Sequence, residues 1–296
     1  MTRGQPSGSR AANDGGSGTL KTGHRIFLPC GAALLLLNLQ FYLLFLLFSL
    51  VAIPGLTLTV AILAIFLSHR RTMRYFRMAI RWYGWVIMHM PGFPWIRVGC
   101  RNLGDGSVPG PFLFICNHRS ASDPFLMACI PEEGIQLVNI WPLRLPVLGP
   151  YAKGAGYLSI NEMDVEAFYA QGRKLLGEGV SMVSFPEGHR STGPEMLPFH
   201  SSIFRLALQT RASLVPLCIS GNERIPPKGS LLLRPGLIRI DRLPPVPWAE
   251  YKDLDAFHLK KKIRDLMSSH LAEMEGRPTD RTNGEPAGEA KEEPTD

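Results

Sequence analysis

The 296-residue chain lacks any paired spacing of its cysteines. It has five cysteines and no CxxC motif, so nothing in the sequence indicates a disulfide framework or a zinc site. We therefore expect all five to be small, buried apolar residues of a protein in a reducing compartment. They are Cys30, Cys100, Cys116, Cys129 and Cys218.

Two catalytic signatures are also missing. No Gly-x-Ser-x-Gly segment is present, which argues against a serine hydrolase. Gly154-Ala155-Gly156 begins like a dinucleotide-binding loop, but it precedes a predicted strand instead of following one, so that signal fails. We expect no resident cofactor and no metal.

Charged residues are absent from Ile26 to Leu67. The run is long enough for two membrane-embedded helices, because a single crossing needs about 20 apolar residues. Pro54-Gly55 interrupts it and is typical of a turn or a kink. We expect a helical hairpin in the membrane; the alternative is one long helix kinked at the proline.

Basic residues flank this apolar run on both sides, with Arg25 before it and several arginines after it. Such flanks favour the cytosol, so we expect a membrane protein whose catalytic domain lies on the cytosolic face. The net charge of +7 and pI near 9.3 favour an anionic membrane surface as partner, and not nucleic acid.

Four arginines recur at helical spacing after the apolar run, among aromatic residues such as Trp82 and Trp85. This pattern predicts a helix in the lipid headgroup layer, with its guanidinium groups directed toward lipid phosphates. The alternative is an ordinary solvated basic face on a domain helix. The arginines are Arg70, Arg74, Arg77 and Arg81.

Past the breaker cluster at 90–94, short β-branched runs alternate with helical stretches, which predicts an α/β fold: a mixed sheet flanked by helices, preceded by the membrane hairpin. The predicted strands are 95–98, 112–116, 136–139, 157–160, 180–185, 213–219 and 237–243. The predicted domain helices are 124–129, 165–178, 201–210 and an amphipathic helix over 259–274. The expected organisation is a disordered lead (1–23), the membrane hairpin (24–68), a basic interfacial helix (69–92), the catalytic domain (93–275) and a disordered tail (276–296).

Two predicted strands end in polar segments. His118 and Asp123 follow the run 112–116, and Phe185 to Ser191 follows the run 180–185. A carboxylate bonded to one imidazole nitrogen fixes the tautomer, so that the other nitrogen can take a proton from a hydroxyl. The simpler explanation for Asp123 is a helix N-cap before Pro124.

These segments resemble the sequence blocks of the glycerolipid acyltransferase family, whose best-known members are the 1-acylglycerol-3-phosphate acyltransferases. The first block matches Asn117, His118 and Asp123. The third matches Phe185 to Ser191, with His189 where threonine is usual. The fourth, an apolar run with a central proline, matches 214–217 around Pro216.

The second block departs from the family pattern. Glu162, after Asn161, stands where the family has an arginine credited with contacting the acceptor's phosphate. By resemblance, His118 and Asp123 are the catalytic residues. The implied substrate-binding residues are Asn117, Asn161, Glu187, Gly188, Arg190, Ser191 and Pro216. Arg190 would grip a phosphate, and its alternative role is a salt bridge to Glu187 or Glu195.

The resemblance implies transfer of a fatty acyl group from a thioester of coenzyme A or acyl carrier protein to the hydroxyl of a lysoglycerolipid in phospholipid biosynthesis. The expected acceptor is 1-acylglycerol-3-phosphate; Glu162 leaves open another lysolipid, such as a lyso-ornithine lipid. A thioesterase or esterase using the same His–Asp pair, and a non-catalytic lipid-binding protein, are the rivals from other classes.

Overall fold

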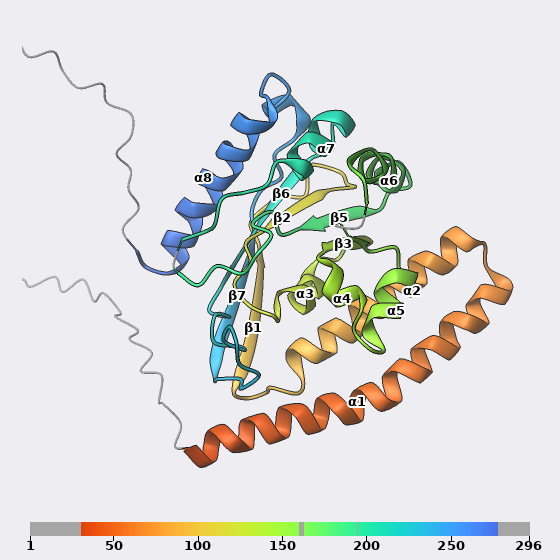
Figure 1. Cartoon of the computed structure of the whole chain (residues 1–296), viewed down its shortest axis with the longest axis vertical. Coiled ribbons are helices and arrows are strands. Elements are labelled where there is room, and N and C mark those ends of the chain that lie inside the picture. The colour runs from red at the N-terminus through yellow and green to blue at the C-terminus, as the bar shows by residue number, and fades with distance from the viewer. Residues whose placement is uncertain (1–30, 160–162, 194, 278–296) are drawn as a thin grey trace, which may run out of the picture.

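The computed structural model describes residues 31–159, 163–193 and 195–277. They form a seven-stranded sheet with helices on both faces and one long helix along its lower side (Figure 1). The strands are β1 (Ile96–Asn102), β2 (Leu113–Cys116), β3 (Gly134–Val138), β4 (Leu158–Ser159), β5 (Ser181–Ser184), β6 (Leu214–Ser220) and β7 (Gly236–Arg242). The helices are α1 (Gly31–Phe66), α2 (His69–His89), α3 (Asp123–Leu126), α4 (Ile140–Leu143), α5 (Leu148–Gly154), α6 (Val165–Gly177), α7 (Ser202–Thr210) and α8 (Ala256–Met274), with 3₁₀ turns η1 (Met127–Cys129) and η2 (Trp248–Glu250).

The sheet order is β1-β7-β6-β2-β5-β3-β4, and every neighbouring pair is parallel except β6 and β7. This confirms the predicted mixed sheet flanked by helices, and each of its strands overlaps a run predicted from the sequence. The central strands β2, β5 and β6 are buried over their whole length, as expected for strands that are covered on both faces.

The two faces of the sheet carry separate cores. Leu113 and Ile115 of β2 pack with α6, α7 and α8, whereas Phe114 between them faces the side of α2 and α3. Tyr251, which is fully buried at the end of η2, donates to the carbonyl oxygen of Ala212 at 2.6 Å and ties this turn to the α7 side. The α2 and α3 side is the one that borders the site described below.

The predicted membrane hairpin is wrong. Residues 31–66 form one helix that continues through Pro54, and the chain reverses at Leu67 and Ser68, after which α2 runs back to the sheet (Figure 1). A helix that continues satisfies nearly all of its own backbone hydrogen bonds, which apolar surroundings demand. Among the described residues, α1 is the one helix long and apolar enough to cross a membrane.

Polar side chains of α1 attach it to the domain along most of its length. Asn38 exchanges two hydrogen bonds with the backbone of Leu233, at 2.8 and 3.0 Å. Farther along, the Ser49 hydroxyl bonds the Tyr83 hydroxyl at 2.7 Å. The outward face of α1 remains apolar and exposed, with Leu50 and Val51 among its most exposed side chains. One face of α1 therefore packs against the domain, and the opposite face is apolar and exposed.

The predicted lipid-facing direction of the arginines on α2 is wrong for three of them. Arg70 and Arg77 both bind Glu133, each with an Nη1 atom 2.7 Å from its Oε1. Arg81 donates to the carbonyl oxygen of Ile130 at 3.1 Å, and Arg74 is exposed. Arg70 and Arg77 therefore bind a carboxylate just before β3, and Arg81 binds a backbone carbonyl, so these three side chains hold α2 against the domain.

The prediction of no disulfide is also wrong, because Cys100 of β1 is bonded to Cys129 of η1. The two residues are 29 positions apart, and only the fold brings them together. Cys116 and Cys218 are buried free thiols, as expected, and Cys30 lies outside the described residues.

Replacing Glu133 by Gln is expected to lower the free energy of unfolding by about 3 kcal/mol, because it leaves the buried Arg77 without a counter-charge. Arg70 is partly exposed and contributes little. Burial raises the pKa of Glu133, but the hydrogen bonds from both arginines outweigh it and hold that pKa below its usual value of 4.5.

A carboxyl group with a depressed pKa stabilises the fold above its unfolded pKa and loses that contribution as the pH falls through its folded pKa. The difference between wild type and variant should therefore be complete at neutral pH and shrink in acid below about pH 4.5. Thermal unfolding in detergent, followed by circular dichroism, measures it. The exposed Glu195→Gln is the matched control, and equal stability of the two variants would contradict the assignment.

Candidate active site

The site lies where three parallel central strands end. Asn117 follows β2, Phe185 follows β5, and Gly221-Asn222 follows β6. Since β2 is paired in parallel with both β5 and β6, these residues share one edge of the sheet. Catalytic and binding groups commonly occupy this carboxyl edge in α/β folds.

His118 and Asp123 form a bonded pair on the turn between β2 and α3. The Nδ1 atom of His118 is 2.6 Å from the Oδ2 atom of Asp123. The Asp123 side chain is fully buried, while that of His118 is 20% exposed, so the other ring nitrogen is accessible to a substrate. The ring also packs on Phe185, with 5.0 Å between the ring centroids.

Asp123 is held by more than the imidazole. Its Oδ2 atom accepts the backbone N–H groups of Arg119 and Ser120, at 2.8 and 3.0 Å, and its Oδ1 atom accepts the side-chain amide of Asn222. The N-cap alternative for Asp123 is wrong, because the N-cap of α3 is Ser122 and Asp123 is the first residue of the helix; its carboxylate orients the ring instead. Three donors besides His118 compensate a buried charge.

Asn117 and Glu187 fix the turn without facing a substrate. Asn117, fully buried, exchanges two hydrogen bonds with the backbone of Ile219, at 2.8 and 2.9 Å. Glu187 accepts the backbone N–H groups of His118 and Leu197, each at 2.7 Å. Burial raises the pKa of Glu187, and these two hydrogen bonds oppose that shift. Both residues therefore brace the loops, whereas the sequence analysis predicted that they bind substrate.

The glycine turn of the third block also lies beside the pair. Gly188 has φ = +70°, a conformation that favours glycine, and an added Cβ there would come within 3.0 Å of His200 Nε2. The Ser191 N–H donates to the carbonyl oxygen of His118 at 2.8 Å, which joins the third block directly to the catalytic turn.

Arg190 sits next to that junction and is half-buried. Within the described ranges its guanidinium makes no ion pair, and both oxygens of Glu187 are used elsewhere, so the salt-bridge alternative with Glu187 is excluded. Lys228, from the loop after β6, approaches with its Nζ atom 3.4 Å from the Arg190 carbonyl oxygen. The side chains of Arg190 and Lys228 therefore place two positive charges near the catalytic turn, which runs from His118 to Pro124.

One predicted substrate-binding residue, Pro216, is not part of this arrangement. Pro216 lies in the middle of β6, buried and paired with Ile115, several residues short of the edge. Asn161 and the neighbouring Glu162 lie outside the described residues. Over the ranges that the structure covers, no group of three His, Cys, Asp or Glu side chains is placed to hold a metal ion.

Sequence reasoning missed Asn222, the residue that binds the second oxygen of Asp123. The signal was available: Asn222 follows the buried strand β6, just as Asn117 follows β2 and Glu187 follows β5. In each place a polar residue lies within three positions of the end of a buried strand, and that pattern predicts a residue at the site edge.

A family model described as Acyltransferase matches residues 97–220, from β1 to the end of β6. That range contains the His118–Asp123 pair and the loop of Glu187 and Arg190, in the arrangement described above. Residues 97–220 of the chain therefore match an acyltransferase domain. This domain supplies the whole site except Asn222 and the following loop.

Among the relatives of this chain, a 1-acyl-sn-glycerol-3-phosphate acyltransferase from Cocos nucifera is 29% identical over 166 residues, and the alignment covers 54% of each chain. The chain thus spans about half the length of that relative. The protein of the same name from Salmonella typhimurium is 27% identical over 189 residues, covering 61% of this chain and 75% of the relative.

The fold of the acyltransferase also matches a solved structure. The crystal structure of the 1-acyl-sn-glycerophosphate acyltransferase PlsC from Thermotoga maritima superimposes with a TM-score of 0.67 at 21% identity. The match covers 84% of this chain and 98% of the other, so it extends beyond the sheet into the preceding helices.

Proposed function

We propose that the protein transfers a fatty acyl group from an acyl thioester to the free hydroxyl of a lysoglycerolipid, with 1-acylglycerol-3-phosphate as the acceptor. The observation that carries this is the His118–Asp123 bond at 2.6 Å, beside the half-buried Arg190, whose guanidinium makes no ion pair with any described residue. The names of the relatives supply the substrate class.

In this reaction the exposed ring nitrogen of His118 takes the proton of the acceptor hydroxyl as its oxygen attacks the thioester carbonyl carbon. Asp123 stabilises the imidazolium that forms. When the tetrahedral intermediate collapses, the carbon–sulfur bond breaks and the imidazolium returns the proton to the departing thiolate. The products are an ester and a free thiol of coenzyme A or acyl carrier protein, and atoms and charges balance without an acyl-enzyme.

Arg190 would bind the acceptor phosphate, since its planar guanidinium suits bidentate contact with phosphate oxygens. Replacing Arg190 by Ala is expected to raise KM for 1-acylglycerol-3-phosphate by about tenfold to a hundredfold and change kcat less, because a charge-assisted bond contributes about 1.5–3 kcal/mol. Steady-state kinetics in mixed micelles measures this.

The exposed Arg205→Ala on α7 is the control for loss of a positive charge. An unchanged KM in the Arg190 variant would contradict the phosphate role. A KM effect of the same size with zwitterionic and amine-bearing lysolipids would instead show that Arg190 acts on the loop.

The reaction itself is tested with labelled acyl-coenzyme A and acyl carrier protein donors against a panel of lysolipids. Acyl transfer that requires a lysolipid supports the proposal. Release of free fatty acid at the same rate with or without lysolipid would identify a thioesterase instead. Lipid binding without turnover would identify a non-catalytic binding protein.

The apolar, exposed face of α1 supports association with a membrane, and we propose that the catalytic domain faces the cytosol, where acyl thioesters are made. The Cys100–Cys129 bond argues the other way, because cytosolic thiols are kept reduced. The orientation is tested by alkylating free thiols in intact cells and then in permeabilised cells, and comparing the labelling of Cys100 and Cys129. Protection of these two cysteines as a disulfide in cells would overturn the cytosolic orientation.

A further inference from the structure

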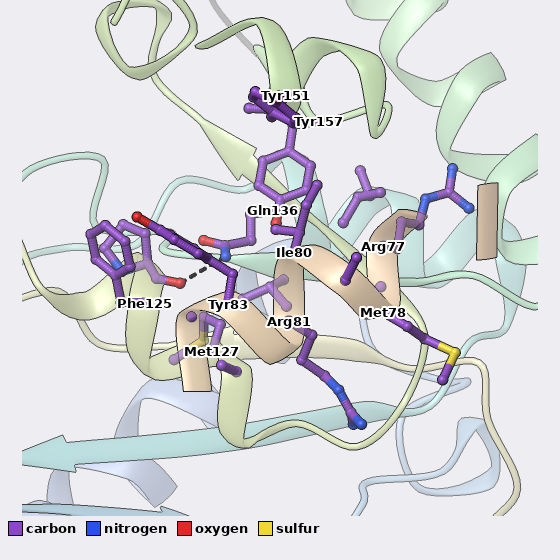
Figure 2. A pocket seen from close by; sticks show the side chains of 18 of the residues that line it. Arg77, Met78, Ile80, Arg81, Tyr83, Phe125, Met127, Gln136, Tyr151 and Tyr157 are labelled. Carbon is purple, nitrogen blue, oxygen red and sulfur yellow. Dashed lines mark hydrogen bonds between the residues drawn. The ribbon is translucent and has the colours of Figure 1, made fainter. Parts of the chain in front are cut away.

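A cavity of about 250 Å³ lies on the α2 and α3 side of the sheet (Figure 2). Its walls come from α1, α2, the α3–η1 turn, β3 and α5, and most are apolar. Ala121 and Pro124, which belong to the catalytic turn, line one part of it. The cavity therefore opens from the neighbourhood of His118 and Asp123 toward the membrane-facing helices.

Three tyrosines line this cavity, and two of them serve to hold α1. The Tyr83 hydroxyl bonds Ser49 at 2.7 Å, and the Tyr151 hydroxyl bonds Thr57 at 2.5 Å. Tyr157 has no such partner on α1, and Figure 2 shows it pointing toward Gln136. Burial raises the pKa of Tyr157 to about 12, while a side-chain hydrogen bond from Gln136 and the nearby charge of Arg77 oppose that shift, so the hydroxyl stays protonated and able to donate.

Gln136 is a polar residue on β3, paired with the apolar Val183 of β5. Its side-chain nitrogen donates to the Pro124 carbonyl oxygen at 2.8 Å, but its buried Oε1 atom accepts no hydrogen bond from the described residues. The residue is 8% exposed. A buried acceptor left unbonded costs about 1–3 kcal/mol, so the site favours a ligand that satisfies it.

We propose that Gln136 and Tyr157 form a polar subsite in this cavity that recognises a hydroxyl group on the acyl chain of the thioester donor. The proposal rests on the acyl transfer proposed above. A hydroxyl group fits both partners at once, because it can donate to Gln136 Oε1 and accept from the Tyr157 hydroxyl. A carbonyl group could accept but has nothing to donate, and an unsubstituted chain leaves Gln136 Oε1 unpaired.

The position of the subsite indicates where on the chain that hydroxyl lies. Gln136 is bonded to Pro124, and Pro124 directly follows Asp123, the partner of His118. The reacting thioester carbonyl must lie at His118. The hydroxyl recognised by the subsite therefore belongs near the thioester end of the chain, and 3-hydroxyacyl donors are the class expected to fit.

The test compares acyl-coenzyme A donors of one chain length, unsubstituted, with a hydroxyl at carbon 3, or with a hydroxyl at the far end, using one lysolipid acceptor. In the full-length wild type, kcat/KM should be about tenfold higher for the 3-hydroxy donor, as expected for one or two neutral hydrogen bonds. The preference should vanish when the hydroxyl is at the far end.

Tyr157→Phe removes only the donor of the subsite and should reduce the ratio of 3-hydroxy to unsubstituted kcat/KM to near one. Tyr151→Phe is the matched control: it removes a hydroxyl from the same cavity whose partner is Thr57, and it should keep the wild-type ratio. Because both readings are ratios within one variant, a partial loss of folding cancels.

A wild-type ratio near one, or a ratio that survives in Tyr157→Phe, overturns the proposal, and the pair then holds a water molecule or nothing. Such a result leaves acyl transfer from unsubstituted donors intact. If no donor is transferred to any lysolipid, the proposed function itself fails, so the two failures are distinguishable.

Discussion

Replacing His118 by Ala is expected to lower kcat/KM for acyl transfer by roughly 10³-fold, within the range of about 10²–10⁴ that a general base contributes. The imidazole is the base of the proposed reaction, and no other titratable side chain within the described residues bonds Asp123. Transfer of labelled acyl groups to the lysolipid acceptor, measured under subsaturating conditions, gives the value.

His258→Ala provides a matched control for that experiment. His258 is also bonded to an aspartate, with its Nδ1 atom 2.8 Å from Asp255, but both side chains are more than half exposed on α8. Removing this second imidazole should leave acyl transfer unchanged. Residual activity of the His118 variant within a factor of ten of the wild type would refute the general-base role.

Replacing Asp123 by Asn is expected to lower kcat/KM by roughly 10³- to 10⁴-fold, because the neutral amide no longer stabilises the imidazolium. The fold should survive the change. The Oδ1 atom of Asn222 is buried and unbonded, so a rotated Asn222 amide can accept from the new side-chain nitrogen. The same transfer assay measures the loss, and the circular dichroism spectrum should match the wild type.

Asp255→Asn makes the same chemical change in the exposed His–Asp pair, and asparagine caps a helix as well as aspartate does. This control should retain full activity. An Asp123→Asn variant that is inactive and also unfolded would show that the carboxylate matters for the turn and not for the proton.

The parts of the molecule that sequence reasoning predicted are those governed by local patterns. Buried runs such as 112–116 and 180–185 identified the central strands, and the polar residues after them identified the site edge. His118 and Asp123 are near each other in the chain, so a short turn sufficed to pair them. The apolar length of α1 likewise needed no tertiary information.

What the sequence could not give depends on contacts between distant residues. Arg77 binds Glu133, 56 positions away, and no helical periodicity distinguishes a guanidinium aimed at a carboxylate from one aimed at lipid. Cys100 meets Cys129 only because η1 packs near β1. The reversal at 67–68 in place of 54–55 follows from α1 packing on the domain across Pro54, with Ala52 and Tyr83 in one small cluster.

The far half of α1 has a consequence for handling the protein. Ile53, Leu56, Thr57 and Val60 form part of the cavity wall, so the segment proposed to contact the bilayer is also one wall of the cavity next to the catalytic turn. Deleting this segment of α1 to obtain a soluble fragment would remove one wall of the cavity. A change in the lateral pressure of the surrounding lipid that shifts α1 should therefore change the acyl-chain selectivity of the protein.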